Sequence, residues 1–241
     1  MRPRKANHRR TNHRHRCAPR FTPLVGEYLE PRTLLAVTPQ LLTDLNVGPA
    51  GILVHGPIVW LPDNFGYFSG GYGANDYELW KTDGTQAGTV LVKDINPGIS
   101  GSHPDHLTEV NGTLFFTADD GTNGTELWKS NGTTAGTVLV KDIAGSPFSS
   151  SPSLLTNVSG TLFFTAFDFT NGTELWKSNG TTAGTVLVKD IVSGFFGPGI
   201  SEMVNESGTL FFNAAQTFAD YQLWKSDGTS GGTVKVTSVT G

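Results

Sequence analysis

The chain has 241 residues with 30 glycines and 13 prolines, which indicates many turns and short elements and therefore an all-β protein. Its formal net charge of −4 is unevenly distributed, because residues 37–241 carry 8 lysines, no arginine and 19 acidic residues, a balance of 8 − 19 = −11. Such an acidic field repels phosphate, which excludes nucleic acid as the partner of this region. No run of about eighteen apolar residues occurs, so we predict no transmembrane segment.

Residues 1–36 form a separate basic segment. Residues 1–20 hold 8 of the 17 Lys and Arg, 3 of the 6 His and no acidic residue. This composition predicts a tail that is disordered in isolation. An ordinary signal peptide would need a continuous apolar run after the charges. The following FTPLVGEYLEPRTLLA does not provide one, because it is interrupted by Pro23, Glu27, Glu30, Pro31 and Arg32.

The eight residues Leu29 to Ala36 read LEPRTLLA behind this Arg- and His-rich start. They resemble the LEPR-XLL motif found near the N-terminus of large surface or secreted proteins of planctomycete bacteria. The resemblance implies export or sorting to the cell surface. We therefore expect an extracellular or cell-surface protein, and a plain disordered tail is the alternative.

Residues 37–241 contain four copies of one repeat, whose centres are marked by tryptophans spaced 48 residues apart: Trp80, Trp128, Trp176 and Trp224. Around the second and third tryptophans the text ELWKSNGTTAGTVLVKDI recurs without change. A fixed period of this length is typical of solenoids and propellers. The predicted units are about 41–95, 96–143, 144–191 and 192–241.

Each unit divides into four short runs, which in the third unit read PSLLTNV, TLFFTAF, TELWKS and TVLVKDI. They are rich in β-branched and aromatic residues and end at Ser-Gly, Asn-Gly or Asp-Gly turns. Four antiparallel strands in this length match one propeller blade. The LFF runs are apolar on both faces and must be covered on both. We therefore predict an all-β, propeller-like array of four-stranded antiparallel blades with the tryptophans at the contacts between blades.

The pattern ELWK…GT…GT…LVKDI also resembles the ELWxxDGT (hyalin-like) repeat of bacterial extracellular proteins, over nearly all of residues 37–241. The resemblance implies a propeller-like, secreted or surface module without a general activity. The last unit departs from it at Gln222 and at Thr237-Ser238-Val239. Residues 41–48 read like the last strand of a preceding blade, so we expect an open, partial or partner-dependent propeller.

A ligand site is expected where the units differ. Trp60 and Trp80 are 20 residues apart whereas Phe116 and Trp128 are 12 apart, which indicates an eight-residue expansion in the first unit. Aromatic side chains on such a glycine-rich loop suit stacking on a sugar or on a protein partner. The alternative is an insertion whose rings cover the exposed first blade. The ligand-binding candidates are Phe65, Tyr67, Tyr72, Asp76 and Tyr77.

No metal site or cofactor is predicted, although two weak candidates exist. Asp119 and Asp120 begin the segment closest to a calcium loop, but the later ligand positions of such a loop are missing. His103 and His106, spaced H-x-x-H around Asp105, have the residue types of a zinc site but lie in a Pro/Gly-rich connection. The turn residues Asp83, Asn131, Asn179 and Asp227 alternate Asp with Asn, which predicts Asx turns.

The glutamates Glu78, Glu126 and Glu174 occupy equivalent repeat positions, whereas catalysis by paired carboxylates needs unlike environments. No phosphate-binding loop or nucleophile elbow occurs. We therefore expect no enzyme activity and an exported surface or structural module that binds a protein, a glycan or a second copy. One alternative is a carbohydrate-binding or carbohydrate-active propeller. Another is a fragment of a longer array with no independent function.

Overall fold

A computed structural model describes residues 51–73, 75–217 and 220–236. The basic segment 1–36 with its LEPR-XLL motif lies outside the described residues. The same holds for the strand predicted at 41–48 and for Thr237-Ser238-Val239. Within the described ranges, no helix is long and apolar enough to cross a membrane.

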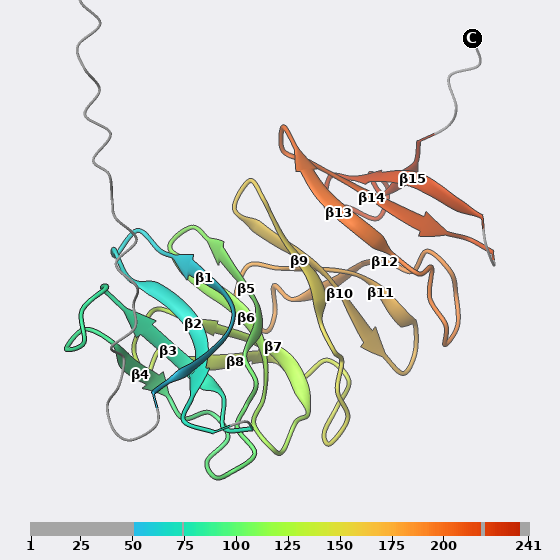
Figure 1. Cartoon of the computed structure of the whole chain (residues 1–241). Helices are drawn as coiled ribbons and strands as arrows, with labels where there is room; N and C mark the ends of the chain where they lie inside the picture. Colours follow the sequence, from blue (N-terminus) through green and yellow to red (C-terminus); the bar gives the residue numbers. More distant parts are fainter. Residues whose placement is uncertain (1–50, 74, 218–219, 237–241) are drawn as a thin grey trace, which may run out of the picture. The chain divides into compact units, whose positions relative to one another are not determined.

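The described residues form sixteen strands in four antiparallel sheets, each with its strands in chain order (Figure 1). Blade 1 contains β1 (Leu53–Trp60), β2 (Gly66–Gly71), β3 (Glu78–Thr82) and β4 (Val90–Lys93). Blade 2 contains β5 (Asp105–Val110), β6 (Thr113–Asp119), β7 (Thr125–Ser130) and β8 (Val138–Lys141). Blade 3 contains β9 (Ser153–Val158), β10 (Thr161–Asp168), β11 (Gly172–Ser178) and β12 (Val186–Lys189). Blade 4 contains β13 (Ser201–Glu206), β14 (Thr209–Ala215), β15 (Tyr221–Ser226) and β16 (Val234–Lys235). The all-β, propeller-like fold is confirmed.

The predicted turn chemistry is confirmed in both kinds of turn. The hairpins that join the first two strands of blades 2 to 4 place two consecutive residues at positive φ, as Asn111 and Gly112 do at 50° and 78°. This conformation matches the twist of the flanking strands and is accessible to Asn, Ser and Gly at low cost. In the DGT and NGT loops, Asn131 Oδ1 accepts hydrogen bonds from the backbone N (3.1 Å) and Oγ1 (2.7 Å) of Thr133. Asp and Asn are interchangeable there because each supplies the same acceptor.

The strand register corrects the predicted expansion of the first unit. Phe68 pairs with Trp80 across β2 and β3, as Phe116 pairs with Trp128 across β6 and β7. Phe68 is therefore the counterpart of Phe116, and both are 12 residues before their tryptophan. The additional length lies between β1 and β2, where residues 61–65 replace a two-residue turn.

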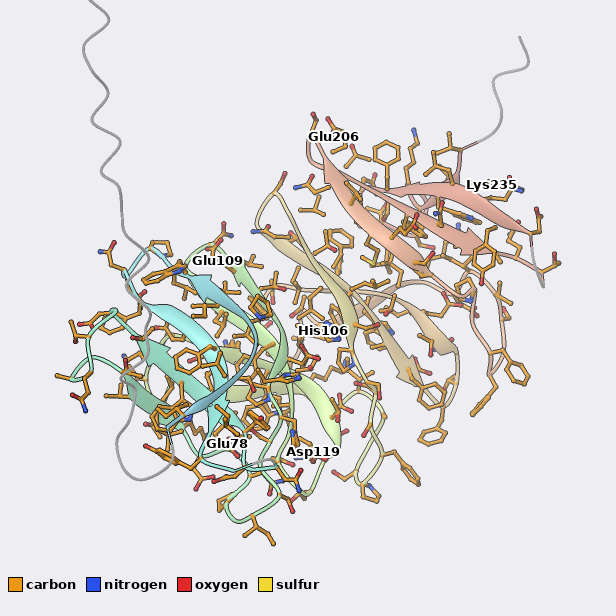
Figure 2. All side chains as sticks on the ribbon, in the orientation of Figure 1. Glu78, His106, Glu109, Asp119, Glu206 and Lys235 are labelled. Atoms are coloured by element: carbon orange, nitrogen blue, oxygen red, sulfur yellow. The ribbon has the colours of Figure 1, made fainter. Side chains whose placement is uncertain are left out.

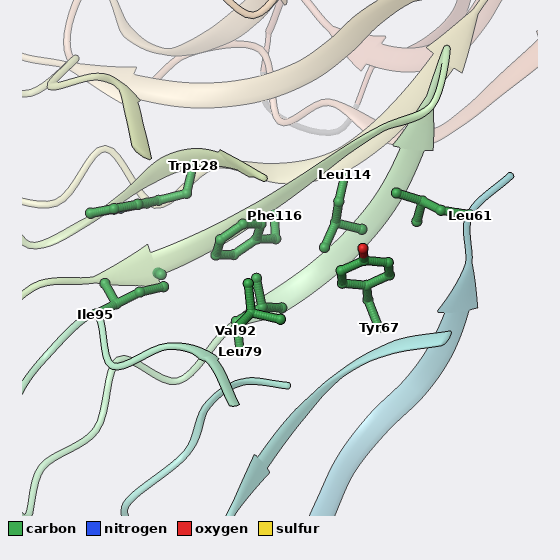
Figure 3. Close-up of a cluster of buried hydrophobic side chains, with 9 residues drawn as sticks. Leu61, Tyr67, Leu79, Val92, Ile95, Leu114, Phe116 and Trp128 are labelled. Carbon is green, nitrogen blue, oxygen red and sulfur yellow. The ribbon is translucent and has the colours of Figure 1, made fainter. Parts of the chain in front are cut away.

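Successive blades pack face to face through a repeated apolar cluster. Leu114, Phe116, Ala118 and Trp128 of blade 2 lie against Tyr67, Leu79, Val92 and Ile95 of blade 1 (Figure 3). Equivalent side chains form the contacts between blades 2 and 3 and between blades 3 and 4. The predicted position of the tryptophans is thus confirmed for Trp128, Trp176 and Trp224. Trp80 instead packs with Ile52 and Phe68 of its own blade.

Two sets of lysines also cross from one blade to the next. The lysine of each ELWK run donates to a turn carbonyl of the following blade, as Lys81 Nζ does to Gly132 O (2.8 Å) and Lys129 Nζ does to Gly180 O (2.7 Å). The lysine of each LVK run does the same, and Lys93 Nζ lies 2.8 Å from Thr137 O and 5.6 Å from the centroid of the Trp128 ring. These charge-assisted bonds supplement the apolar contact.

The repeated glutamates hold the connections between blades. The carboxylate of Glu126 is fully buried and accepts hydrogen bonds from Ile143 N (3.1 Å), Ser150 N (2.8 Å) and Ser150 Oγ. Glu78, labelled in Figure 2, does the same for the connection between blades 1 and 2 through Ile95, Asn96 and Ser102. These donors would otherwise be buried without a partner. The structural interpretation of the glutamates is therefore confirmed.

Glu174 has fewer donors than its counterparts. Among the described residues it accepts hydrogen bonds from the backbone N atoms of Ile191 (3.1 Å) and Val192 (3.1 Å) but none from a serine, because Pro198 stands where Ser102 and Ser150 stand in the other connections. Proline supplies neither an N–H nor a hydroxyl. Burial raises the pKa of Glu174 from 4.5 to about 7, since two hydrogen bonds do not compensate for the loss of water.

This shift predicts a pH-dependent stability. The folded protein binds the Glu174 proton more tightly than the unfolded chain, so the contribution to stability is complete below about pH 4.5 and decreases as the pH rises through about 7, by about 2–3 kcal/mol. Glu174→Gln removes this titration and should flatten that part of the profile. Urea unfolding of both proteins at several pH values across this window measures the difference. Identical pH slopes for wild type and Glu174→Gln would contradict the assignment.

Candidate functional site

One polar position varies among the blades, at the edge where the first strand pairs with the second. The pairs are His55 with Ser69, Asp105 with Thr117, Ser153 with Thr165 and Ser201 with Asn213. The first strands lie beside one another, β1 next to β5, β5 next to β9 and β9 next to β13. This edge therefore collects the polar side chains of successive blades, and its chemistry differs from blade to blade.

Among the second-strand members of these pairs, Ser69 makes no side-chain hydrogen bond with the described residues. Thr117 Oγ1 donates to Asp105 O (3.3 Å), Thr165 Oγ1 shares a hydrogen bond with Ser153 Oγ (2.7 Å), and Asn213 Nδ2 donates to Glu202 Oε2 (2.8 Å). Ser69 is 1% exposed, and its Oγ has no partner among the described residues. A buried hydroxyl of this kind costs free energy unless something binds to it.

Ser69 forms part of the wall of a hollow of about 320 Å³, together with His55, Tyr77, His103 and Asp105. This volume is at the lower end of the range for small-ligand sites. The Tyr77 ring centroid lies 5.6 Å from that of His55 and 5.9 Å from that of His103, at interplanar angles of 56° and 43°. Three ring faces, a hydroxyl and a carboxylate therefore meet in one hollow.

The backbone fixes this arrangement. The N atoms of Ser102 and His103 both donate to Tyr77 O, at 2.9 and 3.0 Å. His103 has a φ of 49°, a conformation that few non-glycine residues adopt. Asp105 Oδ1 accepts from His106 N (2.7 Å), and its second oxygen makes no hydrogen bond with the described residues. The carboxylate therefore keeps acceptor capacity for a ligand.

The five aromatic and acidic candidates do not come together. Tyr67 is fully buried in the contact between blades 1 and 2, and its hydroxyl donates to Asp63 Oδ2 (2.7 Å). This placement corrects Tyr67 as a ligand-binding residue, because its ring is not accessible. Phe65 packs against the same cluster and lies under Lys81 Nζ, 4.7 Å from its ring centroid. Both residues belong to the core side of blade 1.

Tyr72 and Asp76 lie in a second, shallower hollow with Ile99, separate from that of Tyr77. Tyr72 is 45% exposed, and its ring meets the Trp80 ring edge to face at 5.6 Å. Its ring therefore covers part of the first blade, as the alternative interpretation of this loop predicted. Tyr77 is the candidate that reaches the hollow with the buried hydroxyl.

The two metal candidates have other roles. Within the described ranges, no three His, Cys, Asp or Glu side chains are close enough together to surround a metal. Asp120 Oδ1 accepts from Thr122 N (2.9 Å) and Asn123 N (2.8 Å), which closes a turn. Asp119 Oδ1 accepts from Gly121 N (2.7 Å) in the same loop. His103 packs beside Tyr77, and His106, labelled in Figure 2, lies in the bulge of β5.

Two members of the hollow, His55 and Ser69, were not anticipated from the sequence. Their signal is a difference between the units at aligned positions, since His55 stands where the later units have Asp105, Ser153 and Ser201, and Ser69 stands where they have Thr117, Thr165 and Asn213. Tyr77 stands where the next two units have Thr125 and Thr173, and His103 and Asp105 stand where the third has Ser151 and Ser153. Aligning β2 with the later LFF runs would have placed Tyr67 in the core.

No protein-family profile matches the sequence, and no curated protein matches it. The structure is similar to that of a puromycin hydrolase, with 13% identity and a TM-score of 0.51, over 78% of this chain and 30% of that one. It is similar to a prolyl endopeptidase, with 10% identity and a TM-score of 0.52, over 77% and 26%. The chain spans less than a third of either enzyme. At these identities the likeness shows the fold alone.

Glycoside hydrolases are also among the similar structures. An α-L-arabinofuranosidase of Clostridium thermocellum has 14% identity and a TM-score of 0.36, over 77% of this chain and 72% of that one. An endo-1,4-β-xylanase of Bacteroides thetaiotaomicron has 17% identity and a TM-score of 0.35, over 78% and 72%. The expectation of no enzyme activity is therefore corrected, because propellers similar to this one include enzymes and the fold does not exclude catalysis; at these identities and TM-scores the likeness assigns no activity to this chain. Missing sequence motifs did not justify that exclusion.

Proposed function

We propose that the array is a carbohydrate-recognition propeller that binds a glycan in the hollow of His55, Ser69, Tyr77, His103 and Asp105. The observation that carries the proposal is the buried Ser69 hydroxyl, which has no partner among the described residues and lines the same hollow as the rings of His55, Tyr77 and His103. A sugar ring offers an apolar C–H face to an aromatic ring and hydroxyls to Ser and Asp. Such a hollow combines apolar walls with a few convergent polar groups, as small-ligand sites do.

The sequence supports an extracellular setting for this binding. The LEPR-XLL resemblance implies export, and a glycan of a cell envelope or matrix is a partner available there. The acidic array, at −11, favours a neutral or cationic glycan over a sulfated or uronic one, because like charges repel.

Glycan-array screening of the full chain, followed by calorimetry with the best ligand, tests the proposal. Tyr77→Ala should weaken binding at least about tenfold, or about 1.4 kcal/mol, because the central ring of the hollow is lost. Thr125→Ala is a matched control, since Thr125 occupies the same position in blade 2. An array without any bound glycan would contradict the proposal, as would equal affinities of wild type and Tyr77→Ala.

Hydrolysis is measured on the same ligands. Among the described residues, Asp105 is the one carboxylate that lines this hollow, whereas glycoside hydrolysis generally uses two carboxyl groups. Release of reducing sugar that Asp105→Asn abolishes would identify a carbohydrate-active enzyme with Asp105 in the reaction. If Asp105→Asn still binds the glycan and neither it nor the wild type hydrolyses it, the protein recognises the glycan without acting as an enzyme on it.

A further inference from the structure

The outer face of blade 4 has the chemistry of an interface that the described residues leave uncovered. This face consists of Val204, Phe211, Leu223 and Lys225, which share one side of the sheet by strand pairing. Its leucine, Leu223, is 46% exposed, whereas the equivalent Leu79, Leu127 and Leu175 of blades 1 to 3 are fully buried. Val204, at 56% exposure, replaces the Thr108 and Thr156 of earlier blades. This face is thus more apolar than its counterparts in the earlier blades, although the described residues leave it exposed.

The three internal contacts show what such a face binds. Each is covered by the opposite face of the next blade, and each ELWK lysine donates to the glycine of that blade's DG or NG turn. The last example is Lys177 Nζ to Gly228 O (2.7 Å), beside Asp227. Lys225 is the fourth lysine of this series and makes no such bond within the described ranges. The counterpart of Gly228 in blade 1 is Gly84, which follows Asp83.

On the opposite side of blade 1, Phe68 and Trp80, the counterparts of Phe116 and Trp128, are already buried in a cluster with Ile52. Gly66 stands in place of Leu114, and a side chain there would meet Ile58 at 2.7 Å and the Trp60 ring at 3.2 Å. Ile58 and Trp60 therefore occupy the space of the missing leucine. Trp60 is 57% exposed, and Leu91, the counterpart of the half-buried Leu139, is 43% exposed. Isolated apolar residues are common on surfaces, but Ile58, Trp60 and Leu91 are exposed together on the side of blade 1 where the repeated contact would form.

We propose that the outer face of blade 4 binds the first blade of a second copy of this chain, with Lys225 directed at the Asp83-Gly84 turn. Charge complementarity selects this pairing over blade 4 against blade 4, because the latter would bring two copies of Lys225 together. The contact is heterologous, so two copies supply eight blades, within the range of known propellers. The inference does not depend on glycan binding.

The mass of the full chain in solution tests the proposal by light scattering across a range of concentrations. We expect a mass that rises to at least twice the 25.8 kDa of one chain. Leu223→Asp should weaken association at least about tenfold, because it places a charge in the apolar contact. Phe196→Asp is the control, since Phe196 is 86% exposed in the connection before blade 4 and should leave the mass unchanged.

A charge exchange identifies the partner surface. Lys225→Asp and Asp83→Lys should each weaken association, and the combined variant should restore it. Both side chains are exposed, so these variants test the contact even if Leu223→Asp fails to fold. A monomeric wild type at all concentrations would overturn the proposal. A dimer that the combined variant does not restore would overturn it as well, because blade 1 would not be the partner surface.

Discussion

Trp128→Ala is expected to lower the free energy of unfolding by about 3–5 kcal/mol, the range for removing a large aromatic side chain from a core. Trp128 is 5% exposed and lies in the contact between blades 1 and 2, against Ile95 and under Lys93. The substitution removes apolar area and the ring face on which the lysine rests, so blade 1 loses part of its support. Denaturant unfolding followed by tryptophan fluorescence and circular dichroism measures the change.

Two matched variants separate the contact between blades from the size of the side chain. Trp128→Phe should cost less than half as much, because the indole Nε1 has no hydrogen-bond partner to lose. Trp80→Ala removes the equivalent ring from blade 1, where only Ile52, Phe68 and Tyr72 are described against it, and should also cost less. If Trp80→Ala and Trp128→Ala lowered the free energy of unfolding equally, the tryptophan would not stabilise the protein through the contact between blades.

Glu126→Ala should destabilise the protein by about 3–5 kcal/mol, since it leaves two buried donors and one partly buried donor of the connection between β8 and β9 without an acceptor. The donors are Ile143 N, Ser150 N and Ser150 Oγ. Amide hydrogen exchange of residues 143 and 150 should accelerate together, because the connection opens locally. Unfolding and exchange measurements on the same variant check both effects.

Glu126→Gln is the control, because its amide keeps one acceptor oxygen and should retain part of the stability. Glu174→Ala should cost less than Glu126→Ala, since Glu174 has two donors instead of three. A loss below about 1 kcal/mol in Glu126→Ala would contradict a structural role for the buried carboxylate.

The repeat was sufficient to predict the blades and their contacts, because a 48-residue period combined with period-two strands leaves few ways to bury LFF runs. The role of Glu126 could not be foreseen in the same way. Its donors lie 17 and 24 residues further along the chain, in an irregular connection whose path no local pattern specifies. The recurrence of the glutamate at one position of each repeat indicated a structural role. It did not identify the hydrogen-bond donors that the carboxylate binds.

The candidate site was only partly predictable. The divergence of the first unit indicated Tyr77, but aligning Trp60 with Phe116 misplaced the loop and made Tyr67 look accessible. The register of β1 also depends on an irregularity between His55 and Val59, where Gly56 adopts a φ of 74°. That irregularity pairs His55 with Ser69, so the unpartnered hydroxyl follows from a local backbone feature that composition and spacing do not determine.

A crystal structure of the full chain with its best-binding glycan tests most directly whether the hollow lined by Ser69 is a ligand site. We expect a sugar ring beside Tyr77 with one hydroxyl within hydrogen-bond distance of Ser69 Oγ and another near Asp105. A glycan bound elsewhere on the array, with the hollow filled only by solvent, would contradict the claim.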